Sequence, residues 1–194
     1  MPVFYRLHPF AMKSRKEFTD VKDKSHAYYT AIYWASQYGI TKGYSDGSFG
    51  IDKSCTRGHA VMFLWRMAGM PEPTDTGKSP FKDVPVNHAY YKAILWASQK
   101  GITKGFPNGT FGTDTTCTRG QIATFIWRYC GSPAPKAAKS PFKDKLTPAF
   151  EKAIIWAAEN KITKGYPDNT FRDTATCTRG AIVTFLYRVS TLSA

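Results

Sequence analysis

The chain has 194 residues, of which 42% are hydrophobic and 21% charged, so it holds enough apolar surface for a folded core and lacks a disordered composition. Nowhere does a run of about 18 apolar residues occur, which excludes a transmembrane helix. Lys and Arg number 27 against 14 Asp and Glu, a net charge of +13 that indicates an anionic partner such as nucleic acid, anionic lipid or an acidic polymer.

The first segment, residues 1–16, is basic and matches nothing later in the chain. Its apolar residues precede Lys13, Arg15 and Lys16, so it could pack across a groove, contact a partner or be disordered. Met1–Phe18 contains no apolar stretch followed by a small-residue cleavage site, and we therefore expect no signal peptide in this chain.

Three copies of one unit follow, and we place them at residues 17–70, 80–132 and 141–191. Each copy carries a Trp, then Ile-Thr-Lys-Gly, then a Phe, then Cys-Thr-Arg-Gly. The Trp and the Arg are 23 residues apart in every copy, whereas the linkers Pro71–Pro80 and Ser132–Pro141 vary. A constant unit with variable connections predicts three copies of one supersecondary structure packed as one domain.

Each unit is predicted to be a helix, a loop and a second helix. Apolar residues at helical spacing place the first helix from about His26, His88 or Thr147 to Tyr38, Lys100 or Asn160. C-capping glycines follow at Gly39 and Gly101, where the third unit has Lys161. The loops contain the turn pairs Asp46-Gly47, Asn108-Gly109 and Asp168-Asn169. The second helices begin after the N-caps Thr56, Thr118 and Thr178. One helix pair cannot bury its apolar face alone, so the sequence predicts an all-α, pseudo-threefold bundle with three similar grooves.

Three arginines are the strongest candidates for binding: Arg57, Arg119 and Arg179. Each follows an N-cap, where free backbone N–H groups and the helix dipole favour an anion, and a guanidinium adds a planar fork for carboxylate or phosphate. The alternative is a surface arginine paired with an aspartate of a neighbouring unit. Arg66, Arg128 and Arg188 lie in the last helical turn, and we interpret them as structural.

Further candidates surround the Ile-Thr-Lys-Gly segment, a corner of the chain that precedes the arginine in each repeat, and we group each arginine with this preceding corner. They are Lys42, Lys104 and Lys164, the aromatics Tyr44, Phe106 and Tyr166 that follow the glycine, and Trp34, Trp96 and Trp156. The aromatics could stack on a sugar ring and the tryptophans could form a groove wall. Solvated lysines and aromatics packed in the core are the alternatives.

The four cysteines show no CxxC spacing. Cys55, Cys117 and Cys177 recur at equivalent positions, but no fourth ligand accompanies them, so we predict buried thiols and no metal site or cofactor. Cys130 has no counterpart in the other units and is also expected to pack. No nucleophile–base pair recurs and no phosphate-binding glycine loop is present, so an enzyme is not predicted.

Together these motifs resemble the S-layer homology family. The resemblance rests on Phe18-Thr19-Asp20-Val21 and its copies, on Gly39-Ile40-Thr41-Lys42-Gly43 and its copies, and on the Thr-Arg pair that opens each second helix. It implies a three-lobed helical domain that anchors surface proteins to acidic, often pyruvylated, secondary cell-wall polysaccharide. It also implies that Arg57, Arg119 and Arg179 are the main ligands of the acidic group.

The chain departs from the family pattern Thr-Arg-Ala-Glu. Gly58, Gly120 and Gly180 replace Ala, at about 1 kcal/mol each in helix propensity for an interior position. His59, Gln121 and Ala181 replace Glu, so only Gln121 can complete a capping box.

The sequence therefore predicts a non-catalytic module at the cell surface that binds anionic bacterial cell-wall polysaccharide. The alternative is a structural or attachment protein of a phage or surface particle, which would fit the absence of a signal peptide. Nucleic-acid binding fits the charge alone, because no recognition helix or nucleic-acid fold signature is present, and we do not expect it.

Overall fold

The computed structural model describes residues 16–74 and 77–192, so the segment 1–16, apart from Lys16, lies outside the described residues. The fold is all-α, as predicted. Its helices are α1 (Tyr29–Gln37), α2 (Arg57–Met67), α3 (Tyr91–Gln99), α4 (Arg119–Tyr129), α5 (Pro148–Glu159) and α6 (Arg179–Ser190). No helix among the described residues is both long and apolar enough to cross a membrane.

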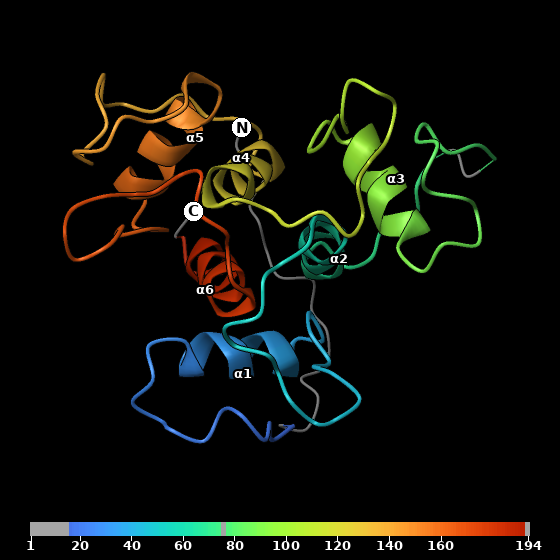
Figure 1. Cartoon of the computed structure of the whole chain (residues 1–194), viewed down its shortest axis with the longest axis horizontal. Helices are drawn as coiled ribbons and strands as arrows, with labels where there is room; N and C mark the ends of the chain where they lie inside the picture. Colours follow the sequence, from blue (N-terminus) through green and yellow to red (C-terminus); the bar gives the residue numbers. More distant parts are fainter. Residues whose placement is uncertain (1–15, 75–76, 193–194) are drawn as a thin grey trace.

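The helices form three arms around a centre. Figure 1 shows α2, α4 and α6 near the middle of the molecule and α1, α3 and α5 outside them. Each outer helix packs on the inner helix of the preceding repeat: α3 on α2, α5 on α4, and α1 on α6, which closes the ring. The sequence predicted a helix pair within each repeat. The observed pairing is between repeats, because the loop that follows each outer helix leads the chain away to the centre.

The predicted helix ends are largely confirmed. Thr56, Thr118 and Thr178 each accept a hydrogen bond from the backbone N–H three residues later, and Gln121 completes the one capping box. Gly39, Gly101 and Lys161 have positive φ after the outer helices. α1 and α3 begin three residues later than predicted, because His26 and His88 lie in a turn, where the ring Nδ1 of each accepts the N–H of Tyr28 or Tyr90.

A ring of backbone hydrogen bonds joins the three repeats at the centre. The N–H of Cys55 donates to the carbonyl of Cys177, that of Cys177 to Cys117, and that of Cys117 to Cys55, at 2.8 to 2.9 Å. Isolated antiparallel bridges between neighbouring segments flank this ring. All three cysteine side chains are fully buried free thiols, as predicted, while Cys130 is half-buried against the core.

An aspartate near the start of each repeat ties the loop to the arm. The Asp20 carboxylate accepts hydrogen bonds from the N–H groups of Phe49 and Gly50, both at 2.7 Å. Asp83 and Asp144 accept equivalent bonds. Partial burial raises the pKa of each carboxyl, but the backbone N–H donors outweigh it and hold the pKa below its ordinary value of 3.8. The Phe-x-Asp motif thus acts as a clamp on the loop.

Because these carboxylates accept hydrogen bonds more strongly when they are ionised, the free energy of unfolding should depend on pH in the acid range. A carboxyl whose pKa is lowered by folding stabilises the protein above its unfolded pKa, and this contribution is lost as the pH falls below 3.8 toward the folded value. We expect Asp83→Asn to lower the midpoint of thermal unfolding at neutral pH. On acidification the midpoint of the variant should fall less than that of wild type. Circular dichroism at a series of pH values measures both. Asp114→Asn is the control, since no hydrogen bond to that carboxylate is found among the described residues. An identical pH profile for Asp83→Asn and wild type would refute the clamp.

Burial of the central thiols predicts their reactivity. Burial raises the pKa of Cys117 and of Cys177 to about 12, and that of Cys55 well above its ordinary value. In native protein a thiol reagent should therefore label Cys130 first and the other three slowly, and all four after denaturation. Fast native labelling of three or more thiols would show that the centre opens readily.

Candidate functional site

The three predicted arginines are buried at the centre of the molecule. Arg57, Arg119 and Arg179 are 4%, 7% and 3% exposed, although each opens an inner helix. No carboxylate forms an ion pair with any of them within the described residues, where the recorded pairs are Lys92–Glu72 and Arg172–Asp168. The alternative of a surface arginine paired with an aspartate is therefore wrong.

A carbonyl oxygen and aromatic rings hold each guanidinium in place. Arg57 donates from Nε to the carbonyl of Phe111 at 2.8 Å, and Arg119 and Arg179 donate in the same way to Phe171 and Phe49. The Cζ atom of Arg57 lies 4.6 Å from the ring centroid of Phe106. Arg57 also donates from Nη2 to Thr103 Oγ1 at 3.2 Å. Cation–π contacts and neutral hydrogen-bond acceptors compensate a buried cation only in part, and burial lowers the pKa of Arg57. Asp83 acts on Arg57 only from beyond ion-pair distance, and no carboxylate among the described residues forms an ion pair with any of the three guanidinium groups.

The lysine–glycine–aromatic corner that meets each arginine belongs to the next repeat. Arg57 packs on Phe106, Arg119 on Tyr166, and Arg179 on Tyr44, at 4.6 to 4.7 Å. The sequence had grouped each arginine with the corner preceding it in its own repeat. That grouping is wrong, because the ring at the centre directs each arginine toward the neighbouring arm.

The first-turn N–H groups are not free to bind an anion, contrary to the prediction. Arg57 N–H donates to the carbonyl of Thr115 and Gly58 N–H to that of Thr113, both at 2.9 Å, while His59 N–H donates to the N-cap Thr56. The other two inner helices repeat this pattern. These N–H groups already donate to carbonyls of the neighbouring repeat or to the N-cap threonine. Binding of an anion must therefore rely on side chains.

Two cavities lie at these arginines. One, of about 210 Å³, is lined by Arg57 together with Thr103, Lys104, Phe106, Gln121, Arg128 and Phe150, among others. The other, of about 360 Å³, is lined by Arg179 together with Lys42, Tyr44, His59, Arg66 and Tyr90, among others. Among the described residues that line them there is no aspartate or glutamate. We call these the Arg57 groove and the Arg179 groove.

Arg119 has equivalent surroundings, with its guanidinium 4.7 Å from the Tyr166 ring and 5.6 Å from that of Phe185. Lys164 lies in the corner of that arm. Because each groove takes its arginine from one repeat, its corner from the next and an aromatic from the remaining one, a complete groove requires all three repeats.

Some groove residues were missed or misassigned from the sequence. Arg66 and Arg128 line the grooves, and each donates from Nη1 to the carbonyl of the isoleucine in the adjacent Ile-Thr-Lys-Gly corner. Arg188 makes the same bond. Their periodic recurrence was visible in the sequence, but the helix-dipole interpretation did not place them beside an arginine of another repeat. Trp34, Trp96 and Trp156 are buried and line neither groove, which favours the packing alternative; Trp34, for example, contacts Tyr187 of α6.

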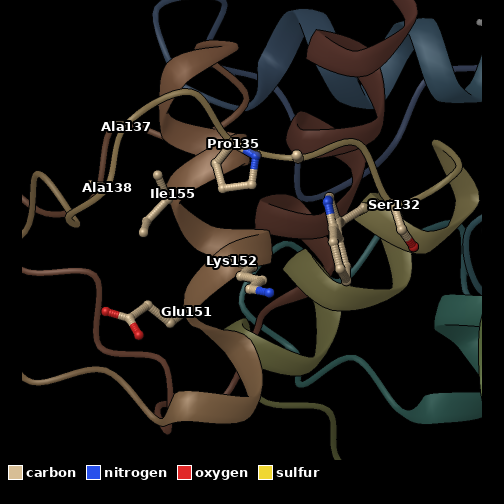
Figure 2. Close-up of a pocket in the computed structure, with 9 residues that line it drawn as sticks. Ser132, Pro135, Ala137, Ala138, Glu151, Lys152 and Ile155 are labelled. Atoms are coloured by element: carbon tan, nitrogen blue, oxygen red, sulfur yellow. The ribbon is translucent and has the colours of Figure 1, made fainter.

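A larger cavity, of about 520 Å³, lies between the second linker and α5. Figure 2 shows it bordered by Pro135 and Ala137 of the linker and by Glu151, Lys152 and Ile155 of α5. It contains no arginine, and its lysine is accompanied by a glutamate, so its chemistry favours an anion less than that of the grooves. No group of three or more His, Cys, Asp or Glu side chains in the described part of the chain could hold a metal ion.

The comparison with known sequences agrees with this architecture. The S-layer homology domain profile matches residues 17–61, 80–123 and 141–182, and the chain belongs to this family. It is 32% identical over 142 residues to cell surface glycoprotein 1 of Acetivibrio thermocellus, covering 68% of this chain and 6% of that protein. It is 29% identical over 154 residues to the cellulosome-anchoring protein of the same organism, covering 76% and 34%. It is 36% identical over 117 residues to a cell surface protein of Thermoanaerobacter kivui, covering 59% and 15%. The chain thus spans about a third or less of the length of these relatives.

An aromatic ring lies over the glycine that follows each buried arginine. A Cβ atom on Gly58 would lie 2.7 Å from the Tyr90 ring, and Gly120 and Gly180 are covered in the same way by Phe150 and Tyr28. These glycines are helical and have no positive φ. A Cβ atom at these positions would overlap the ring, and at Gly58 also the Thr113 side chain, which gives a steric reason for glycine in place of the family's alanine.

The contact predicts an unusual response to Gly120→Ala. Alanine is the better helix former, yet overpacking against Phe150 should lower the free energy of unfolding by roughly 1–3 kcal/mol. In a Phe150→Ala background the same change should be neutral or stabilising, as measured by urea denaturation of all four proteins. If Gly120→Ala is equally destabilising in both backgrounds, the ring is not the reason for glycine.

Proposed function

We propose that the chain is a non-catalytic cell-wall-anchoring module whose inter-repeat grooves bind acidic substituents of a bacterial wall polysaccharide. The observation that supports this is the burial of three arginines without a carboxylate partner. A carboxylate on the polymer, such as that of a pyruvate ketal, would supply the missing countercharge. The names of the relatives, which include surface and anchoring proteins, agree with this role.

The chemistry of a groove suits an acidic sugar. Each guanidinium has Nη donors in addition to the Nε that is bonded to a carbonyl, and one of these, Nη2 of Arg57, also donates to Thr103 Oγ1. A charge-assisted hydrogen bond contributes about 1.5–3 kcal/mol. The exposed lysine at the mouth, Lys42, Lys104 or Lys164, adds a second cation. The aromatic of the corner, Tyr44, Phe106 or Tyr166, offers an apolar surface for a ring face. The presence of more than one such groove on the chain would raise the avidity for a repetitive polymer.

Replacing the arginines by alanine is an ambiguous test of this proposal. Arg57 Nε satisfies the buried carbonyl of Phe111, so Arg57→Ala would remove a structural hydrogen bond as well as a ligand. Arg→Lys is milder and keeps the charge, but it loses the planar fork. The exposed lysines at the groove mouths can be changed with less risk to the fold.

The test is therefore a triple charge reversal at the groove mouths, Lys42→Glu, Lys104→Glu and Lys164→Glu. A matched control reverses the exposed Lys24, Lys100 and Lys145, which line neither groove and change the net charge equally. In a pull-down on purified sacculi, the groove variant should bind at least about tenfold more weakly than wild type and the control variant should bind nearly as well. Extraction of the polysaccharide should abolish binding by all three.

Two outcomes would contradict the proposal. Equal weakening in both folded variants would mean that net charge, not the grooves, governs attachment. Binding to duplex DNA at physiological salt that falls equally in both variants, with no binding to sacculi, would favour a nucleic-acid partner.

A further inference from the structure

The grooves differ at one position, the third residue of the inner helix. His59 occupies it in the Arg179 groove and Gln121 in the Arg57 groove, where each lines the cavity. The third repeat has Ala181, which offers no polar group. The glutamine and alanine side chains are uncharged at every pH, whereas a histidine side chain changes its charge near neutral pH.

We propose that His59 is a specificity-determining residue that makes the Arg179 groove bind an anionic sugar substituent more tightly as the pH falls, while the Arg57 groove lacks this dependence. The inference rests on the proposed function, because it requires that the grooves bind an acidic group. It assigns different binding properties to grooves that share the same arginine and corner.

The imidazole is held with one nitrogen available. Its Nδ1 lies 3.2 Å from Thr56 Oγ1, which also accepts the N–H of His59. The ring stacks on Phe63 with centroids 6.4 Å apart and meets the edge of Tyr90 at 5.7 Å. No hydrogen bond to Nε2 is found within residues 16–74 and 77–192, so a protonated ring could donate from this atom to a ligand.

The neighbours of His59 oppose its protonation in the free protein. The titratable and charged groups around it are Lys42, Tyr44, Arg66, Tyr90, Asp114 and Arg179. Burial and then the charge of Arg179 hold the pKa of His59 below its ordinary value of 6.5, Arg66 lowers it further, and Asp114 opposes this shift. The side chain is therefore neutral at pH 7 when the groove is empty.

A bound anion would reverse this balance. A carboxylate beside Arg179 and Arg66 would neutralise part of their charge and attract the imidazolium, raising the pKa of His59. Binding would then take up a proton, so the affinity would increase as the pH falls through the pKa of the bound state. Each unit by which the ligand raises this pKa corresponds to a tenfold increase in affinity at low pH.

The experiment compares wild type with His59→Gln, which installs the side chain of the Arg57 groove. Affinity for the extracted acidic wall polysaccharide is measured by titration calorimetry at about pH 7.5 and about pH 5.5, on either side of the ordinary histidine pKa of 6.5. The affinity of wild type should increase between the higher and the lower pH by a factor about ten times larger than that of His59→Gln. One charge-assisted hydrogen bond gives a difference of this size. The reciprocal Gln121→His should add a second pH-dependent groove. Titration of the polymer itself cancels in these comparisons.

A second readout is the imidazole NMR signal of His59, assigned by its absence in His59→Gln. Its pKa should rise when polysaccharide is added, whereas the NMR signal of the exposed His26 should not respond to the polymer. If the polymer binds but wild type and folded His59→Gln share one pH profile, or the His59 pKa is unmoved, the inference is wrong and the proposed function stands. If no protein binds at either pH, both are wrong.

Discussion

The closed ring of hydrogen bonds between the three cysteine backbones determines most of this structure. Each cysteine donates to one neighbour and accepts from the other, so no repeat is terminal at the centre. The N–H groups of the arginine and the glycine, two and three residues beyond each cysteine, donate to carbonyls of the adjacent repeat, which brings the N-termini of the inner helices together. The cysteine side chains are small and fully buried, which allows the three backbone segments to approach within hydrogen-bonding distance of one another. They belong to Cys55, Cys117 and Cys177.

The position of the arginines follows from this ring. Each arginine is two residues beyond a cysteine of the ring, so its backbone lies near the centre of the molecule. Its guanidinium therefore extends into the neighbouring arm. There the guanidinium contacts a carbonyl and aromatic rings, but it forms no ion pair with a carboxylate among the described residues. A buried cation left without a countercharge is costly to the folded protein. Its retention in all three repeats at identical spacing is the structural reason to regard the grooves as anion sites.

Local features of the fold were predictable from the sequence, and relations between repeats were not. Thr56 as an N-cap, Gly39 as a C-cap and the Asp46-Gly47 turn depend on neighbouring residues, and the structure confirms them. The partner of Arg57 could not be deduced, because a constant spacing of 23 residues is equally compatible with a corner from its own repeat or from the next. The occupied first-turn N–H groups and the ring over Gly58 also come from other repeats, so no local pattern revealed them.

The central claim is that the buried guanidinium groups contact the anionic part of a wall polysaccharide. Nitrogen-detected NMR of the arginine side chains tests it most directly, because burial should slow exchange of their N–H protons. On addition of extracted polysaccharide, the Nη signals of Arg57, Arg119 and Arg179 should shift, while the Nε signals, already bonded to carbonyls, should change little. Binding that leaves these Nη signals unmoved and instead perturbs residues of the cavity beside α5, such as Lys152, would contradict the account.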